Sequence, residues 1–159
     1  MAEKRRYGIG QQWFPNIIAK QCIYVDKTAY VYKLAHHGGV NYFLSRPRRF
    51  GKSLLVSTLQ AYFEGRRELF RGLAVEQLET EWTQYPVLRL DLSNGKYYDM
   101  NSVDSICGGI LRRLEDDYGL TAPKDAQLSD RLINLIKTAY RQTGRQVVVL
   151  IDEYDAPML

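Results

Sequence analysis

The chain has 159 residues, of which 45% are hydrophobic and 25% are charged, a composition that supports a folded core and argues against pervasive disorder. The formal net charge of +4 is a modest basic excess, and its local clusters are more typical of solvated faces than of a nucleic-acid groove. The first residues contain no apolar signal sequence, and no apolar run approaches the roughly 20 residues of a membrane helix. We therefore expect a soluble, cytoplasmic protein with no membrane partner.

The first forty residues contain one clear helical signal. Residues 27–35 favour a helix, and Asp26 stands before them as an N-cap whose carboxylate can accept the first unpaired amides. Gly38 and Gly39 end the segment. We expect residues 1–40 to form an N-terminal segment with one helix that packs on the core.

A strand, a loop and a helix are predicted next. Residues 41–45 read as a short buried strand, and residues 52–63 carry apolar side chains at helical spacing. Residues 66–70 favour one more helical turn.

The second half of the chain alternates in the same way. Residues 87–92 show the alternation of a strand, and two amphipathic helices follow, with apolar stripes over 106–118 and 128–140. The last apolar run, 147–151, is typical of a strand buried on both faces. Because strands alternate with helices, the pattern predicts an α/β fold with a mainly parallel sheet.

Gly51, Lys52 and Ser53 match the end of a phosphate-binding loop that runs from a strand into a helix. Gly51 lets the backbone approach a phosphate, Lys52 places an ammonium on the β- and γ-oxygens, and the Ser53 hydroxyl ligates Mg²⁺. The usual spacing would put another glycine at position 46, where this chain has Arg46. The three residues are therefore a weak signal by themselves.

Two acids follow the last apolar run and strengthen that signal. Mg²⁺ prefers hard oxygen ligands, which Asp152 supplies directly or through water, and Glu153 can accept a proton from an attacking water or orient it. Right-handed crossovers would bring Lys52 and Asp152 to the same carboxyl edge of the sheet, where α/β folds bind ligands. The alternative is that both acids only cap the next segment.

Several longer stretches resemble the predicted AAA-ATPase-like family of bacterial P-loop proteins. They cover nearly the whole chain in order: GIGQQWF at 8–14, YVDKTAYVYKL at 24–34, YFLSRPRRFGKSLL at 42–55, AYFEGRRELFRGL at 61–73, YPVLRLDLS at 85–93 and VVVLIDEYDAPML at 147–159. The family's loop itself reads RPRRFGKS, so Arg46 departs from the general P-loop formula and not from that of this family.

The resemblance implies ATP and Mg²⁺ as cofactors and ATP hydrolysis as the activity. It implies a loop that binds the nucleotide through Arg46, Pro47, Arg48, Arg49, Phe50, Gly51, Lys52 and Ser53. Lys52 and Glu153 would be catalytic, and Ser53 and Asp152 would hold the metal. A nucleotide-dependent switch with negligible turnover is the alternative function; a small-molecule kinase is disfavoured, because a water-activating acid is wasteful where water must be excluded.

Two details of the loop stay open at this point. Pro47 removes one amide donor, and we hypothesise that Arg48 or Arg49 replaces it with a guanidinium on the phosphate; the alternative is that both face solvent. Tyr24 and Tyr30 are candidates for stacking on adenine, with core packing as the favoured alternative.

The resemblance also bears on architecture and partners. It implies a P-loop-type three-layer αβα fold with residues 41–159 as its partial core, incomplete at the C-terminus, because family members continue through further strands. Many relatives carry a nuclease-like C-terminal domain, so the resemblance implies nucleic acid as a partner of the longer protein through that domain, and a second copy of the chain as another partner.

Overall fold

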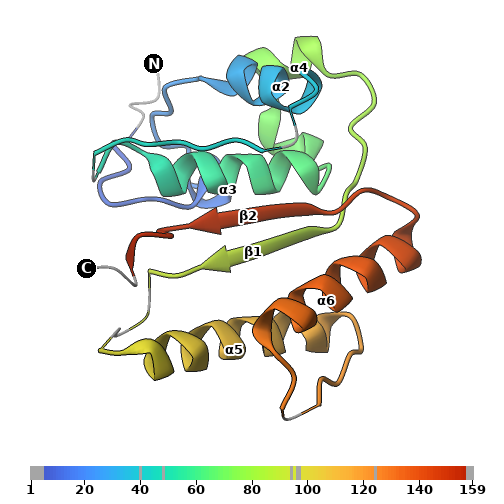
Figure 1. Ribbon diagram of the computed structural model, residues 1–159. Coiled ribbons are helices and arrows are strands. Elements are labelled where there is room, and N and C mark those ends of the chain that lie inside the picture. The colour runs from blue at the N-terminus through green and yellow to red at the C-terminus, as the bar shows by residue number, and fades with distance from the viewer. Residues whose placement is uncertain are drawn as a thin grey trace. The chain divides into compact units, whose positions relative to one another are not determined.

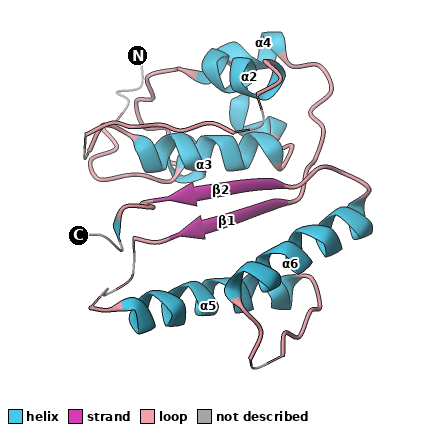
Figure 2. Cartoon of the chain, in the orientation of Figure 1, coloured by secondary structure: helices cyan, strands magenta, loops and turns pink. Residues whose placement is uncertain are grey.

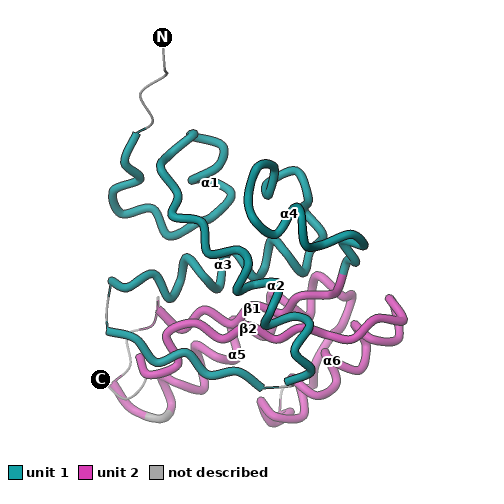
Figure 3. The backbone as a smooth tube through the Cα atoms, turned by 90° about the horizontal axis from the view of Figure 1, so that it is seen from above, with its two compact units in different colours: residues 1–84 teal, residues 85–159 magenta. Residues whose placement is uncertain are grey.

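The computed structural model describes residues 6–39, 41–47, 49–93, 95, 98–123 and 125–156. The chain divides into two compact units, residues 1–84 (unit 1) and residues 85–159 (unit 2), which Figure 3 shows in separate colours. Each unit is described by itself. The division at residue 40 suggested by the sequence stays a prediction.

The described residues of unit 1 contain helices, turns and loops but no strand. Its elements are α1 (Phe14–Ala19), α2 (Thr28–His36), α3 (Lys52–Phe63), the 3₁₀ helix η1 (Arg67–Phe70) and α4 (Ala74–Leu78) (Figure 1). Their shared core is aromatic: the rings of Phe14 and Phe70 are fully buried with centroids 5.0 Å apart, and Tyr62 on α3 packs edge-on to Phe70. The core therefore joins the first helix of the chain to α3 and to the segment after it.

Asp26 and Thr28 join the beginnings of two helices in unit 1. Asp26 Oδ1 accepts hydrogen bonds from the Thr28 amide at 2.8 Å and the Thr28 hydroxyl at 2.7 Å, and Asp26 Oδ2 accepts one from the Ala74 amide at 2.7 Å. Thr28 Oγ1 in turn accepts one from the Val75 amide at 3.0 Å. These two side chains thus satisfy first-turn amides of both α2 and α4, which have no acceptor within their own helix.

Unit 2 consists of a parallel pair of strands and two long helices. Its elements are β1 (Val87–Asp91), α5 (Met100–Asp117), α6 (Leu128–Thr143) and β2 (Val148–Asp152) (Figure 2). β1 and β2 pair in parallel register from Val87 opposite Val148 to Asp91 opposite Asp152. Both strands therefore end at the same edge of the sheet.

The two long helices of unit 2 begin and end at identifiable residues. Asp99 caps α5 through a capping box in which its side chain accepts a bond from the Ser102 amide at 2.8 Å. α6 ends at Gly144, which has a left-handed backbone (φ 65°) that favours glycine. Both helices lie along one face of the strand pair (Figure 1), and their apolar stripes pack with Leu88 of β1.

A charged pair joins α5 to α6 in this core. Arg131 holds both oxygens of Glu115, with Nε 3.0 Å from Oε1 and a terminal nitrogen 2.7 Å from Oε2, and it also donates to the Gly108 carbonyl at 3.1 Å. Both side chains are at most 10% exposed. The hydrogen bond to Glu115 raises the pKa of Arg131 further above its ordinary value.

The structure confirms most elements that the sequence predicts. The predicted helices at 27–35 and 52–63 and the helical turn at 66–70 are present, each with ends within two residues of the prediction. Both amphipathic helices are present where their apolar stripes lie, and the two later strands form a parallel pair. The α/β class is therefore confirmed as a mixed α/β fold with a small parallel sheet. The short helices α1 and α4 were not predicted.

Two structural expectations are wrong. Residues 41–45 form no strand, and Tyr42 and Phe43 are 53% and 72% exposed. An isolated extended segment has no neighbour for its amides and carbonyls, and no strand of unit 1 is described that could pair with it. The last strand is also not buried on both faces, because Val149 and Ile151 are 37% and 51% exposed.

Candidate functional site

The loop that leads into α3 contains two left-handed residues. Arg49 has φ 66° and Gly51 has φ 76°, and Gly51 is the residue before the helix. An added Cβ at Gly51 would meet nothing within 4 Å, so the requirement for glycine comes from the backbone conformation and not from crowding. The chain thus turns sharply into the helix at the residue that the motif predicts.

The N-terminus of α3 faces its loop without a side-chain cap from the described residues. The helix begins at Lys52, and its first helical bond runs from the Leu55 amide to the Gly51 carbonyl at 3.0 Å. Amides before that point have no acceptor within the helix, and the helix dipole adds partial positive charge there. Backbone and Lys52 together make this turn favourable for an anion.

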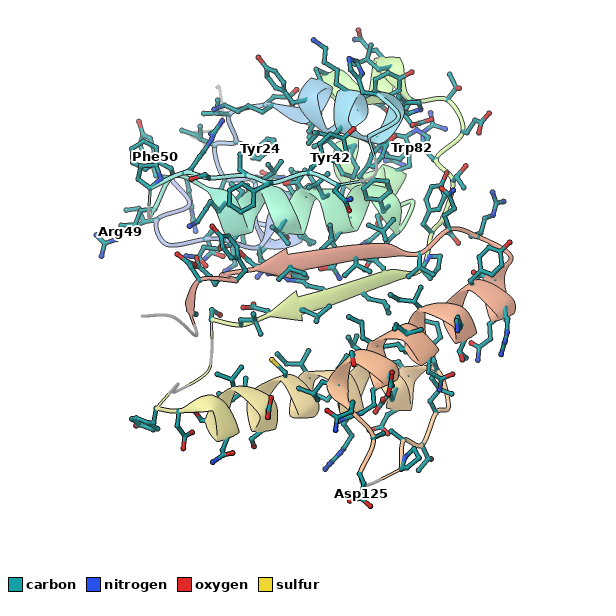
Figure 4. The ribbon with its side chains drawn as sticks, viewed as in Figure 1. Tyr24, Tyr42, Arg49, Phe50, Trp82 and Asp125 are labelled. Carbon is teal, nitrogen blue, oxygen red and sulfur yellow. The ribbon has the colours of Figure 1, made fainter. Side chains whose placement is uncertain are left out.

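The side chains of the loop are exposed. Arg46, Pro47, Arg49 and Phe50 are all solvent-accessible, and Figure 4 shows Arg49 and Phe50 at the turn, directed away from the ribbon. Lys52 and Ser53 are half-buried. Arg48 lies outside the described residues, so its role, like that of Arg49, stays a prediction.

The N-terminal segment packs against α3 and is hydrogen-bonded to it. The buried Ser57 hydroxyl accepts a hydrogen bond from the Phe14 amide at 2.8 Å, which ties the start of α1 to the middle of α3. Tyr24 packs its ring 5.2 Å from that of Phe14 and hydrogen-bonds Thr58, and burial raises the pKa of its phenol. Tyr24 is therefore a core residue, whereas Tyr30 is 62% exposed beneath the Lys33 ammonium.

The second half of the candidate site lies at the common end of β1 and β2. Asp152 is the last residue of β2 and is only 4% exposed, and Glu153 follows in a left-handed conformation (φ 54°). A non-glycine residue at positive φ is uncommon, and such residues cluster at functional sites. The strained turn directs the chain away from the strand immediately after Asp152.

Two further residues at this strand end were missed from the sequence. Asp91 stands opposite Asp152 in the register, and a terminal nitrogen of Arg89 lies 3.2 Å from Asp152 Oδ2 and 3.5 Å from Asp91 Oδ2. The signal was present in the alternation of β1, because residues 89 and 91 fall on the same face of a strand. Only the pairing of β1 with β2 identifies Asp152 as their partner.

The donor chemistry of the predicted metal ligands suits Mg²⁺. Ser53 and Asp152 supply a hydroxyl and a carboxylate, both hard oxygen donors, and Mg²⁺ commonly keeps several waters and takes only one or two protein ligands. No cluster of three metal-binding side chains occurs in the described ranges, which is compatible with such a sparse set. Lys52 and Ser53 belong to unit 1 and Asp152 and Glu153 to unit 2, so their convergence stays a prediction.

None of the described helices is long and apolar enough to span a membrane.

Comparison with known proteins agrees with the resemblance seen in the sequence. A family model described as "Predicted AAA-ATPase" matches residues 7–159. The chain therefore belongs to the predicted AAA-ATPase family.

A curated relative from Azotobacter chroococcum mcd 1, described as "Uncharacterized protein in vnfD 5'region", is 38% identical over 158 residues. That match covers 98% of this chain and 30% of the relative, so the chain spans less than a third of the relative's length. No solved structure matches the chain.

Proposed function

We propose that this chain binds ATP with Mg²⁺ and supplies the nucleotide-binding part of an ATP-hydrolysing protein. One observation carries the proposal: α3 begins at Lys52, directly after a left-handed Gly51, with no side chain of the described part capping its N-terminus. A helix start of this kind is a ready site for phosphate oxygens. Membership in the predicted AAA-ATPase family supports the same reading.

Each residue has a role that its chemistry supports. First-turn amides of α3 and the Lys52 ammonium bind the β- and γ-phosphates, and the Ser53 hydroxyl and the Asp152 carboxylate hold the cation. The bound cation neutralises charge on the phosphates. Glu153, next to Asp152, orients the attacking water and accepts its proton.

The proposal includes a P-loop-type fold. In a P-loop-type three-layer fold, a parallel sheet carries helices on both faces and its ligand at the carboxyl edge. The parallel pair β1–β2, with α5 and α6 on one of its faces, supports such an arrangement. A common nucleotide site would require Lys52 to lie near Asp152 and Glu153, and this convergence is part of the proposal.

Titration of the chain with ATP in Mg²⁺, by isothermal calorimetry, tests the binding step. Lys52→Ala is expected to weaken the binding of ATP by at least about 100-fold, because it removes charge-assisted hydrogen bonds to phosphate. Lys137→Ala removes the same charge from an exposed position on α6 and should leave the affinity unchanged. Equal affinities in the wild type and Lys52→Ala would refute the proposal.

Turnover is tested in a longer protein that contains this chain. Glu153→Gln should retain ATP and lose steady-state phosphate release, and wild-type release by that variant would remove Glu153 from its role. ATP binding with negligible release by the wild type, together with a nucleotide-dependent change in oligomer size, would identify a switch instead. Salt-dependent DNA binding by the longer protein would add nucleic acid as a partner.

A further inference from the structure

Arg89 lies between two carboxylates at the common end of the strand pair. One of its terminal nitrogens is 3.2 Å from Asp152 Oδ2 and 3.5 Å from Asp91 Oδ2. Asp91 and Asp152 are register partners on neighbouring strands. A single guanidinium nitrogen therefore bridges the last residues of β1 and β2.

The two carboxylates depend on Arg89 to different degrees. The Asp152 side chain is 4% exposed, so hydration does little to stabilise a negative charge on it. An ionised carboxylate in that position needs a counter-charge. Asp91 is 35% exposed and keeps much of its hydration. The short contact to Asp152 is thus the one that a buried charge requires.

A metal ion bound by the Asp152 carboxylate would lie close to the Arg89 guanidinium, which already contacts Oδ2 of that group. Two cations beside one carboxylate repel each other strongly at such short separations, above all where solvent is scarce. Arg89 already has a second acceptor in Asp91, so a small displacement of its guanidinium would keep it paired. Arg89 can therefore compete with the cation for Asp152, and Asp91 can pair with Arg89 when the cation is bound.

We propose that Arg89 is a positioning residue that holds the Asp152 carboxylate in place and competes with the divalent cation of the nucleotide for it. The inference rests on the proposed function, because it requires Asp152 to support that cation. Binding of the cation turns Arg89 from Asp152 toward Asp91. The strength of the Arg89–Asp152 pair then sets how much Mg²⁺ improves the affinity for ATP.

The test is the ratio of two ATP dissociation constants, one measured in EDTA and one in excess Mg²⁺, by calorimetry on the whole chain. Arg89→Gln and Arg89→Met remove the competing charge and should raise this ratio by about tenfold. The expected change is moderate because solvent screens the repulsion between Arg89 and the cation. Arg89→Lys keeps a cation at the position and should keep a ratio close to that of the wild type. Arg113→Gln removes an exposed arginine from α5 and serves as the charge-matched control.

A purely structural role for Arg89 would change stability and leave the ratio alone, so an unchanged ratio in folded Arg89→Gln overturns the inference. A second measurement uses NMR on the wild type. The Nε–H resonance of Arg89, assigned by its loss in Arg89→Lys, should shift when Mg²⁺–ATP is added and should not shift when ATP is added in EDTA. A resonance unmoved by Mg²⁺–ATP would also overturn it.

The two levels of proposal fail differently. A wild-type chain that binds no ATP in either solution overturns the proposed function and this inference with it. A wild-type chain whose ATP affinity depends on Lys52, with a Mg²⁺ effect that ignores Arg89, overturns only the role of Arg89.

Discussion

Unit 1 and unit 2 differ in the kind of bond that joins one element to the next. In unit 1, side-chain oxygens accept hydrogen bonds from backbone amides of another element, as Asp26 does from Ala74 and Ser57 does from Phe14. In unit 2, two buried carboxylates pair with arginines of another element, Glu115 with Arg131 between helices and Asp152 with Arg89 between strands.

The difference has consequences for what each unit tolerates. Removing one acceptor from an amide leaves a neutral group without its partner, whereas removing one member of a buried ion pair leaves a charge. We therefore expect single substitutions at the joints of unit 2 to cost more than those of unit 1. Both tryptophans of the chain, Trp13 and Trp82, lie in unit 1, so their fluorescence reports on that unit while circular dichroism reports on both.

The largest effect is expected for Glu115→Ala. It leaves the Arg131 guanidinium buried without its carboxylate and should lower the free energy of unfolding by about 3–5 kcal/mol. Urea unfolding followed by circular dichroism measures the loss. Replacing both residues by apolar ones, Glu115→Met with Arg131→Leu, should recover much of it, and a single-variant loss below about 1 kcal/mol would contradict the ion-pair account.

A smaller effect is expected for Asp26→Ala. It removes the acceptor of three donors at the starts of α2 and α4 and should destabilise unit 1 by about 2 kcal/mol, measured by urea unfolding with tryptophan fluorescence. Asp125→Ala, at the exposed loop aspartate labelled in Figure 4, is the matched control and should change stability by less than about 0.5 kcal/mol. Similar losses in both variants would mean that the Asp26 contacts contribute nothing particular.

The smallest effect is a dependence of unit 1 on acid. Burial alone would raise the pKa of the Asp26 carboxyl, but hydrogen bonds from Thr28 and Ala74 outweigh it and lower the pKa below its ordinary 3.8. The resulting stabilisation is complete above pH 3.8 and is lost as the pH falls through the lower folded-state value. The pKa of the Glu79 carboxyl is also lowered. Its burial acts to raise this pKa, but hydrogen bonds from Tyr62, Glu81 and Trp82 and the nearby His36 outweigh burial, so Glu79 adds to the loss of stability in acid.

Tryptophan-monitored unfolding at a series of acid pH values measures this dependence. Asp26→Asn cannot lose a charge on acidification, so its stability should fall less steeply with pH than that of the wild type. Parallel curves for the two proteins would assign the acid sensitivity of unit 1 to other carboxyls.

Local signals predicted much of the secondary structure. The helix over 52–63 follows from apolar residues at helical spacing after a glycine, and the end of α6 follows from Gly144, because one residue type suits the left-handed turn there. Asp26 was predicted as the N-cap of α2, but Lys27 holds that position, and Asp26 accepts the bond from the Thr28 amide from one residue earlier. The roles of the loop residues and of the acids at 152–153 were predicted from motif and family resemblance alone, and they stay predictions.

The sequence by itself determined where most helices and both paired strands lie, since these depend on spacing and on residues next to one another in the chain. Tertiary structure decided the rest. Residues 41–45 look like a strand but have no described neighbour to pair with, and a strand exists only through its partner. The hydrogen bond from the Ala74 amide to Asp26 spans 48 positions, and the pair of Arg89 with Asp152 spans 63. Contacts between residues so far apart follow from how the elements pack.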